Sequence, residues 1–151
     1  MLPKTITSAV ATLAAALVLA PAADAAGRRV STTPMQRAKA ATIAASKVNA
    51  PYQWGATGPS SFDCSGLLVY AYRAAGNPLK ARTSYDLYRQ GVRIRRASLR
   101  RGDLVWTWDR SLGHVGVYLG RGRYVHAPGA GRRVQISPVP SGGGFVGAVR
   151  P

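Results

Sequence analysis

The chain has 151 residues, the length of one ordinary domain, and its 46% apolar residues are enough for a core, which argues against a disordered chain. The single cysteine excludes an internal disulfide and a cysteine-ligated zinc site, and two histidines argue against a histidine-rich metal site. Twenty-one Lys and Arg residues stand against five acidic ones, all aspartates, and the net charge of +16 predicts a polyanionic partner. Composition leaves nucleic acid, anionic lipid and an acidic cell wall open.

The first 25 residues have the pattern of a secretory signal peptide. A short basic start ends at Lys4, an uncharged apolar run spans residues 6–20, and Ala23-Asp24-Ala25 is a small-x-small cleavage site. We expect cleavage after Ala25, with an uncleaved anchor or a buried helix as the alternatives. The run is shorter than the roughly 20 residues of a membrane span. No cysteine follows it, which excludes a lipoprotein anchor.

Export narrows the choice of polyanion. Removal of residues 1–25 takes away one lysine and one aspartate, so the mature chain keeps a net charge of +16. An exported cation meets the polymers of the cell envelope. We therefore expect anionic wall polymers as partners, no physiological nucleic acid and no stable membrane anchor after cleavage. Solubility and general stickiness are the other explanation of the charge.

Helices are expected in the first half of the mature chain. Residues 26–34 are polar and basic and end in proline, which predicts a linker. Thr33 is a fair N-cap with Pro34 at the first helical position, and Asp63 opens a second helix with an apolar stripe. Residues 52–61 contain glycines, serines and a proline without a period and predict a loop. The expected helices span Met35–Val48, Cys64–Ala75 and, more weakly, Ser84–Gln90.

The second half changes to short segments rich in valine, tyrosine and tryptophan, separated by glycine or proline. This pattern predicts about five antiparallel strands. They are expected over Leu104–Trp108, His114–Leu119, Arg123–His126, Val134–Ser137 and Phe145–Val149. Helices followed by strands indicate an α+β fold, with N-terminal helices packed on a C-terminal antiparallel sheet in one domain over residues 35–151.

The lone cysteine stands where a loop becomes a helix. At such a helix N-terminus, free backbone N–H groups and the helix dipole favour an anion, so Cys64 could hold its thiolate near neutral pH. The alternative is a small buried hydrophobic residue, which cysteine often is. An unpaired thiol in an exported protein favours the reactive interpretation, because it must survive oxidation without a partner.

The two histidines can meet only in one hairpin register. A three-residue turn at 120–122 would place Leu119 opposite Arg123 and His126 opposite Gly116, with both histidines on one face and open space at Gly116. A two-residue turn would put the histidines on opposite faces. The sequence permits the first register without proving it.

A thiol nucleophile needs a base for its proton and a third group that orients the base. Cys64, His114 and His126 are the only residues that supply such a set, because the chain has no glutamate and its aspartates have other expected places. These places are an N-cap for Asp63, an exposed helix face for Asp86, a turn for Asp103 and a loop for Asp109.

Four blocks in order resemble the NlpC family of cell-wall cysteine peptidases. They are Phe62-Asp63-Cys64-Ser65-Gly66-Leu67, Arg101-Gly102-Asp103-Leu104-Val105, Gly113-His114-Val115-Gly116-Val117-Tyr118-Leu119-Gly120 and Val125-His126-Ala127, with Pro51-Tyr52-Gln53-Trp54-Gly55 ahead of the cysteine. The resemblance covers about residues 35–150. It implies a papain-like fold and hydrolysis of peptide bonds in bacterial peptidoglycan stems, commonly between D-glutamate and the diamino acid.

By position, the resemblance implies that Cys64 is the nucleophile, His114 the general base and His126 the orienting residue. It further implies that Tyr52 lies near the oxyanion site and that Asp63 and Ser65, beside the nucleophile, help to hold the substrate. It also implies that the segment Arg82-Thr83-Ser84 lines the cleft, with Ser84 as the expected substrate contact. Two positions depart from the family pattern. Ala56 stands where a glycine is common, and Leu87 stands where a glutamine is common, which leaves the substrate detail open.

Two alternatives stay open, a second enzyme and a protein of another class. The same Cys–His chemistry serves muramyl-L-alanine amidases of related families, and an inactive copy of the fold could be a basic envelope-binding protein. The complete cysteine–histidine set speaks against the second. We expect a monomer that needs no cofactor or metal.

Overall fold

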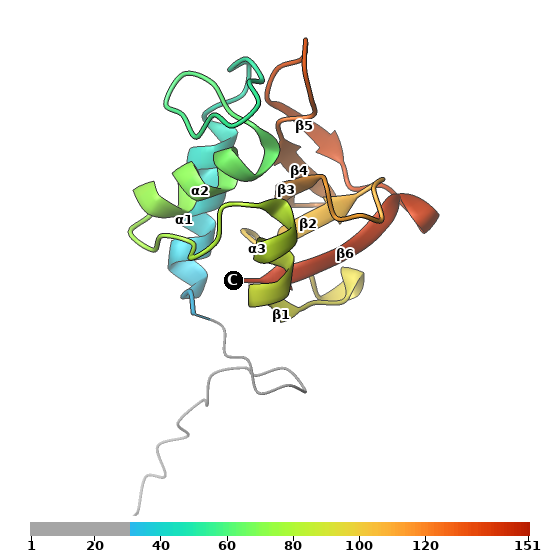
Figure 1. The fold of residues 1–151 in the computed structure, drawn as a ribbon. Coiled ribbons are helices and arrows are strands. Elements are labelled where there is room, and N and C mark those ends of the chain that lie inside the picture. The colour runs from blue at the N-terminus through green and yellow to red at the C-terminus, as the bar shows by residue number, and fades with distance from the viewer. Residues whose placement is uncertain (1–30) are drawn as a thin grey trace, which may run out of the picture.

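The computed structural model describes residues 31–151, so the expected signal peptide lies outside the described residues. Three helices pack on a six-stranded antiparallel sheet (Figure 1). The helices are α1 (Pro34–Ala45), α2 (Cys64–Ala74) and α3 (Ser84–Gln90). The strands are β1 (Val92–Arg93), β2 (Leu104–Thr107), β3 (Val115–Gly120), β4 (Arg123–His126), β5 (Gln135–Pro138) and β6 (Phe145–Arg150), in the order β1-β6-β2-β3-β4-β5. The expected α+β fold is confirmed.

Two expected elements need correction. Helix α1 ends at Ala45 and not at Val48, because residues 46–49 form a turn in which Asn49 has a φ of +75°. The sheet has a sixth strand, β1, whose two residues are too few to show any alternation. Each end of the other five strands lies within one residue of its expected position. The N-cap of α1 is Thr33, as expected, and Gln36 completes a capping box with it.

The described part of the expected linker is docked to the domain. The Thr32 backbone N–H donates to the carbonyl of Pro151 at 3.2 Å, and the Thr32 side chain is buried. Pro34 already belongs to α1. Thr32 and Pro151 therefore tie the two ends of the described chain together, and residues 26–30 of the expected linker lie outside the described residues. None of the helices within residues 31–151 is long and apolar enough to cross a membrane.

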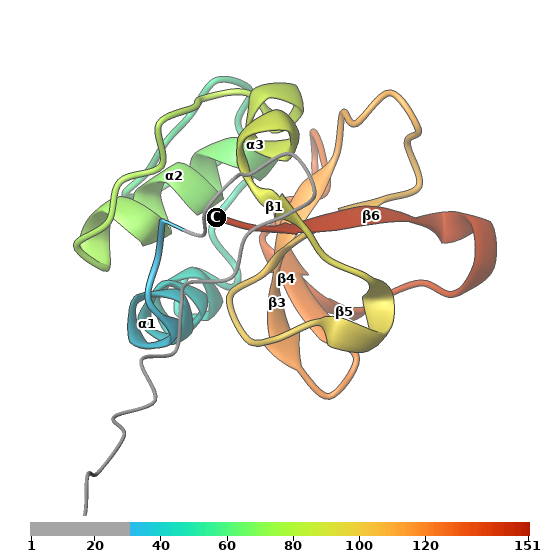
Figure 2. The ribbon, with the colours of Figure 1, turned by 90° about the horizontal axis from the view of Figure 1, so that it is seen from below.

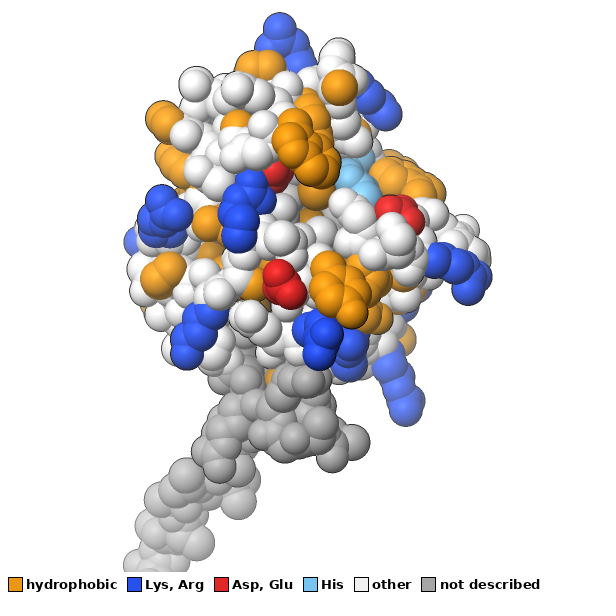
Figure 3. Space-filling model, viewed as in Figure 1, with side chains coloured by type: hydrophobic (Ala, Val, Ile, Leu, Met, Phe, Trp, Pro, Cys, Tyr) orange, Lys and Arg blue, Asp and Glu red, His pale blue; other side chains and the backbone are white. Residues whose placement is uncertain are grey.

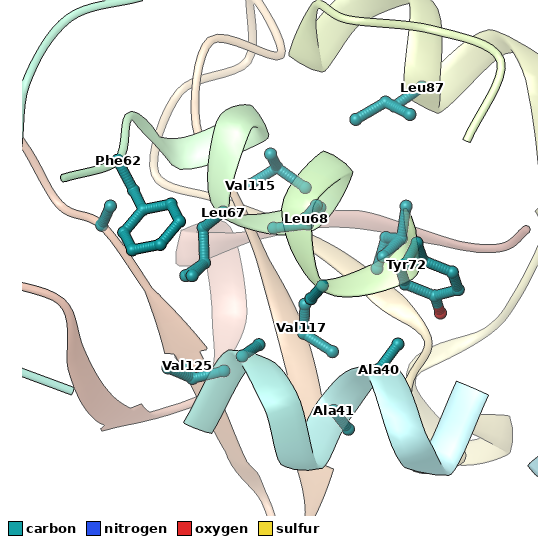
Figure 4. Packing of buried hydrophobic residues seen from close by; sticks show 14 of the residues in the cluster. Ala40, Ala41, Phe62, Leu67, Leu68, Tyr72, Leu87, Val115, Val117 and Val125 are labelled. Carbon is teal, nitrogen blue, oxygen red and sulfur yellow. The ribbon is translucent and has the colours of Figure 1, made fainter. Parts of the chain in front are cut away.

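The core lies between the helices and the middle strands of the sheet. Figure 2 shows α1 and α2 on one side of the sheet. Helix α1 presents Ala40 and Ala41, whose small side chains let it lie close to α2 and β3 (Figure 4). Helix α2 brings Leu67, Leu68 and Tyr72 into the same cluster. Because its first residue is Cys64, burial of this apolar stripe sets the position of the thiol.

A charged cluster is buried at the start of β2. The guanidinium of Arg150 donates two hydrogen bonds to the carboxylate of Asp103, at 2.8 and 2.7 Å, and Asp103 is fully buried. The Tyr72 hydroxyl donates to the carbonyl of Gly102 at 2.5 Å, and burial raises the pKa of Tyr72. Arg37 lies close by, and burial lowers its pKa. Asp103, which the sequence predicts in a turn, is therefore the anion of a buried ion pair with Arg150.

Candidate active site

The loop over residues 52–61 holds the start of α2 in place. Asp63 is the N-cap, and its carboxylate accepts the Gly66 backbone N–H at 2.6 Å. A Cβ at Gly66 would lie 2.0 Å from the carbonyl oxygen of Ala56, so only glycine lets the loop approach this closely. The same carbonyl accepts the Asp63 N–H at 3.0 Å. Ala56 thus contributes its backbone, which any residue could supply.

Cys64 opens into a cleft of about 320 Å³ between α2, α3 and the loop before β3. The cleft is lined by Trp54, Gly55, Asp63, Cys64, Ser65, Arg82, Thr83, Ser84, Tyr85, Ser111, Leu112 and Gly113. The Cys64 Sγ lies 3.5 Å from the carbonyl oxygen of Gly113. The nucleophile candidate therefore contacts the backbone directly before His114.

The free thiol is not poised as an anion. Burial raises the pKa of the Cys64 thiol and outweighs the backbone N–H groups of Val115 and Ser65, which lower it. Asp63 raises it further. The expectation of a thiolate near neutral pH, drawn from the helix N-terminus alone, is wrong because the apolar surroundings penalise the charge more than the N–H groups relieve it. Cys64 needs a base.

The β3–β4 hairpin brings the two histidines together. Gly116 pairs with His126, as the same-face register requires, and the His114 Nε2 lies 2.8 Å from the His126 Nδ1. The expected three-residue turn is wrong: the turn is the two-residue Arg121-Gly122, with Gly120 opposite Arg123, and an irregularity between Tyr118 and Gly120 restores the same-face register. The expected open space at Gly116 is also absent, since a Cβ there would lie 2.9 Å from the His126 Cβ.

Both imidazoles are held neutral. Burial lowers the pKa of His114 to about 4, with Asp109 opposing this shift and Arg132 adding to it. Burial, then the neighbouring His114, and then Arg132 lower the pKa of His126 to about 3. A neutral imidazole can accept the proton of a thiol, so the pair has the protonation state that a general base requires at neutral pH.

Trp108 covers the histidine pair from the outside. Its ring stacks on His114 with centroids 5.7 Å apart and lies 5.7 Å from His126. The side chain is 55% exposed, and its backbone has a φ of +61°, a value that few bulky residues adopt. This contact could not be predicted from the sequence, in which Trp108 is expected as the last residue of a strand.

Tyr52 and Cys64 are close enough to interact. Burial raises the pKa of Tyr52, and the charges of Cys64 and Asp63 raise it further. The Tyr52 N–H donates to the carbonyl of Arg132 at 2.9 Å, which anchors the loop of the cleft to the sheet. Tyr52 thus lies within electrostatic range of Cys64, and its role at the oxyanion site stays a prediction.

Three polar side chains beside Cys64 form one network. Arg82 donates to both oxygens of Asp63, at 2.6 and 3.2 Å, and to the Ser65 Oγ at 2.8 Å. The resemblance implies that Asp63, Ser65 and Arg82 lie at the cleft, but it does not predict that Arg82 pairs with Asp63 and Ser65. The Arg82 side chain is 40% exposed, so part of this charge faces the cleft. A basic residue within reach of Asp63 could not be found from spacing alone.

Ser84 lines the cleft, but its hydroxyl is hydrogen-bonded to a buried side chain. Its Oγ accepts the indole N–H of Trp106 at 2.8 Å, and the residue is buried. Its expected contact with substrate remains a prediction. Leu87, one of the two departures from the family pattern, is buried in the core. Within residues 31–151, no three His, Cys, Asp or Glu side chains are grouped so that they could hold a metal ion.

The cysteine, the cleft and the neighbouring histidine pair match a known family. The family model described as "NlpC/P60 family" matches residues 49–144, which hold all of these side chains. The chain belongs to the NlpC/P60 family.

Two of its relatives are endopeptidases by name. It is 38% identical over 126 residues to a probable endopeptidase of Corynebacterium glutamicum, covering 83% of this chain and 57% of the relative. It is 38% identical over 109 residues to the murein DD-endopeptidase MepH of Escherichia coli, covering 66% of this chain and 40% of the relative. The chain thus spans about half the length of these NlpC/P60 relatives.

Solved structures agree on the fold. The P60 domain of an antigen from Mycobacterium avium subspecies paratuberculosis matches with a TM-score of 0.65 and 30% identity, covering 76% of this chain and 93% of that domain. The peptidoglycan hydrolase RipB of Mycobacterium tuberculosis matches with a TM-score of 0.67 and 31% identity, covering 76% and 64%. The papain-like arrangement of the NlpC/P60 fold is thereby confirmed.

Proposed function

We propose that this NlpC/P60 chain is a peptidoglycan endopeptidase in which Cys64 is the nucleophile, His114 the general base and His126 its orienting partner. The observation that carries the proposal is the pair of neutral histidines, joined at 2.8 Å, on the strands next to a cysteine that opens into a cleft. The names of relatives support the substrate class, since MepH is called a murein endopeptidase and RipB a peptidoglycan hydrolase.

The reaction proceeds through a thioester. His114 takes the thiol proton as the Cys64 Sγ attacks the carbonyl carbon of the scissile amide. The oxyanion is stabilised by the Cys64 backbone N–H and the Tyr52 hydroxyl, donors of a kind worth roughly 2.7–4 kcal/mol. The tetrahedral intermediate collapses, and the amine leaves with the proton from His114. Water, deprotonated by His114, then hydrolyses the thioester, which releases the acid and regenerates the thiol.

We assign the scissile bond to the stem peptide, between D-glutamate and the diamino acid. The name of MepH, a DD-endopeptidase, favours a cross-link between two stems as the second candidate. Mass analysis of soluble muropeptides after incubation with the protein separates the two. Loss of the diamino acid and the residues beyond it from uncrosslinked stems supports the first bond. Conversion of dimers into intact monomers supports the second, and release of a whole stem from muramic acid would instead indicate an amidase.

We also propose that the chain is exported, with the signal peptide removed after Ala25. The basic start, the apolar run and the Ala23-Asp24-Ala25 site support this. N-terminal sequencing of the secreted protein should begin at Ala26. Secreted protein that still begins at Met1 contradicts the proposal.

The basic surface, we propose, binds anionic wall polymers. Figure 3 shows Lys and Arg side chains spread around the margin of the face that exposes histidine, with few acidic ones. Exposed charges are screened over about 10 Å at 0.1 M salt, so binding to purified walls should fall steeply as salt is raised. Binding that is the same at low and high salt would show that the charge is not the anchor.

A further inference from the structure

The polar chain that begins at His114 continues beyond His126. The His126 Nε2 lies 3.0 Å from the Ser137 Oγ, and this oxygen accepts a hydrogen bond of 3.2 Å from the Gln135 Nε2. The Arg132 Nη2 donates to the Gln135 Oε1 at 3.5 Å. The carboxamide oxygen therefore faces Arg132, and its nitrogen faces Ser137. The catalytic pair is thus connected to an edge strand that the proposed mechanism does not use.

Strand pairing builds this arrangement. In the β4–β5 register, His126 lies opposite Gln135 and Tyr124 lies opposite Ser137. Alternate residues of a strand share a face, so all four side chains lie on one face of the sheet, and His126 meets Ser137 diagonally. Tyr124 stacks on His126 with ring centroids 4.5 Å apart, which restricts rotation of the imidazole.

The position of the His126 proton follows from the chemistry. When His114 has taken the thiol proton, both of its nitrogens carry hydrogen, so its Nε2–H must donate to the His126 Nδ1. A neutral His126 then carries its own hydrogen on Nε2. His126 is only 1% exposed, so water is largely kept away from this N–H. The acceptor that the described residues provide is the Ser137 Oγ.

We propose that Ser137 is a positioning residue that accepts the Nε2 hydrogen of His126 and thereby stabilises His114 in its protonated form. Gln135 occupies another lone pair of the same oxygen and holds the hydroxyl in place. This inference rests on the catalytic roles assigned above to Cys64, His114 and His126. It assigns a role to β5, which neither the motifs nor the cleft lining includes.

Loss of the acceptor would leave a buried N–H unsatisfied in the state where His114 holds the proton. The penalty for such a group corresponds to a roughly ten-fold lower rate of proton transfer from Cys64. Substrate binding is unaffected, because Ser137 does not line the cleft. The expected signature is therefore a lower kcat with an unchanged KM.

The test compares Ser137→Thr with Ser137→Val. The two side chains have nearly the same shape and suit a strand equally, but only threonine keeps the hydroxyl. Cys64 is the only cysteine of the chain, so alkylation by iodoacetamide measures its deprotonation with no substrate present. At neutral pH we expect the threonine variant to react within about two-fold of the wild-type rate and the valine variant about ten-fold more slowly. Equal rates for the two variants overturn the proposal.

Two further measurements keep the result interpretable. Urea unfolding shows whether both variants are folded. If Ser137→Val is not folded, Ser137→Ala replaces it. Its control is then Ser141→Ala, which alters an exposed loop serine. Cleavage of muropeptides is measured in parallel. A threonine–valine contrast in alkylation without any cleavage supports the role of Ser137 and contradicts the proposed function. Cleavage with no contrast in alkylation supports the function and overturns the role of Ser137.

Discussion

The molecule buries two polar clusters, and they are built on opposite principles. In the Asp103–Arg150 pair, two full charges meet through two hydrogen bonds and leave no charge uncompensated. In the His114–His126–Ser137 chain, the two imidazoles can change protonation but are held neutral by burial. The first arrangement suits a structural link between β2 and β6, and the second suits transfer of a proton.

The comparison shows that apolar surroundings can hold a structural ion pair in one place and keep titratable histidines neutral in another. A buried ion pair is strongly destabilised when one partner is removed, because the other is left charged in apolar surroundings. Removing one histidine of the neutral pair leaves no uncompensated charge behind, but it removes the proposed base or its partner. Substitutions in the two clusters should therefore separate activity from stability, in opposite directions.

The largest effect is expected on activity from Cys64→Ala or His114→Ala. Groups that act as one unit lose nearly all of their effect when either is removed, so hydrolysis of muropeptides should fall by at least about a thousand-fold. The midpoint of urea unfolding should stay near that of the wild type. Wall-degrading activity that survives in pure Cys64→Ala protein would refute the cysteine mechanism.

The next effect is on stability, from Asp103→Asn. The substitution keeps the shape but leaves the Arg150 guanidinium without its counter-charge, and breaking such a buried pair costs about 3–5 kcal/mol. Urea unfolding at neutral pH measures the loss, with Asp86→Asn as the matched control on an exposed helix turn. The alkylation rate of Cys64 in the folded variant should be unchanged. A loss equal to that of the control would show that the pair contributes little.

The third effect is a loss of folding stability at acidic pH. Ordinary histidine titrates near 6.5, but in the folded chain the pKa of His114 is about 4 and that of His126 about 3. Above pH 6.5 both states are neutral, and as the pH falls toward 4 only the unfolded chain takes up these protons. Stability contributed by the neutral pair is therefore present above pH 6.5 and is lost between there and the folded pKa values, by up to a few kcal/mol.

The matched variant for this effect is His126→Gln. It removes one of the two proton-binding sites that the unfolded chain exposes, so the fall in unfolding free energy between about pH 7 and 4.5 should be smaller than in the wild type. Aspartates contribute equally to both proteins and cancel in the comparison. An identical fall in the two proteins would mean that His126 is not held neutral by the fold.

Local patterns were sufficient for much of this architecture. The caps at Thr33 and Asp63 and the apolar stripe of α2 placed the cysteine at a helix start. The hairpin pattern permitted a same-face register for the two histidines, and the structure has that register at His126. These features depend on neighbours in sequence or on one hairpin. They also identified Cys64, His114 and His126 together. The structure has Cys64 in the cleft and His114 directly after the cleft residue Gly113, within hydrogen-bond distance of His126.

The features that the sequence left out depend on distant contacts. Arg82 meets Asp63 across 19 positions, and Arg150 meets Asp103 across 47. Ser137 meets His126 only because β5 pairs with β4 in one register. The raised pKa of the Cys64 thiol has the same origin, since desolvation depends on what packs around the group and not on the helix that carries it.

The smallest effect separates two adjacent arginines. Arg132 lowers the pKa of both histidines, whereas Arg133, which donates to the carbonyl of Asn49, is not among the groups that shift them. Both arginines are exposed, and each substitution to glutamine removes one positive charge from the segment just before β5. Arg132→Gln should raise the pKa of His114 and move the acid limb of the alkylation rate upward by about 0.3 pH units, because an exposed charge acts through water. Arg133→Gln should leave the limb unchanged, and the difference should vanish in about 1 M salt, where the screening length is near 3 Å. Equal shifts in the two variants would mean that net charge, and not the placement of Arg132, acts on the histidine pair.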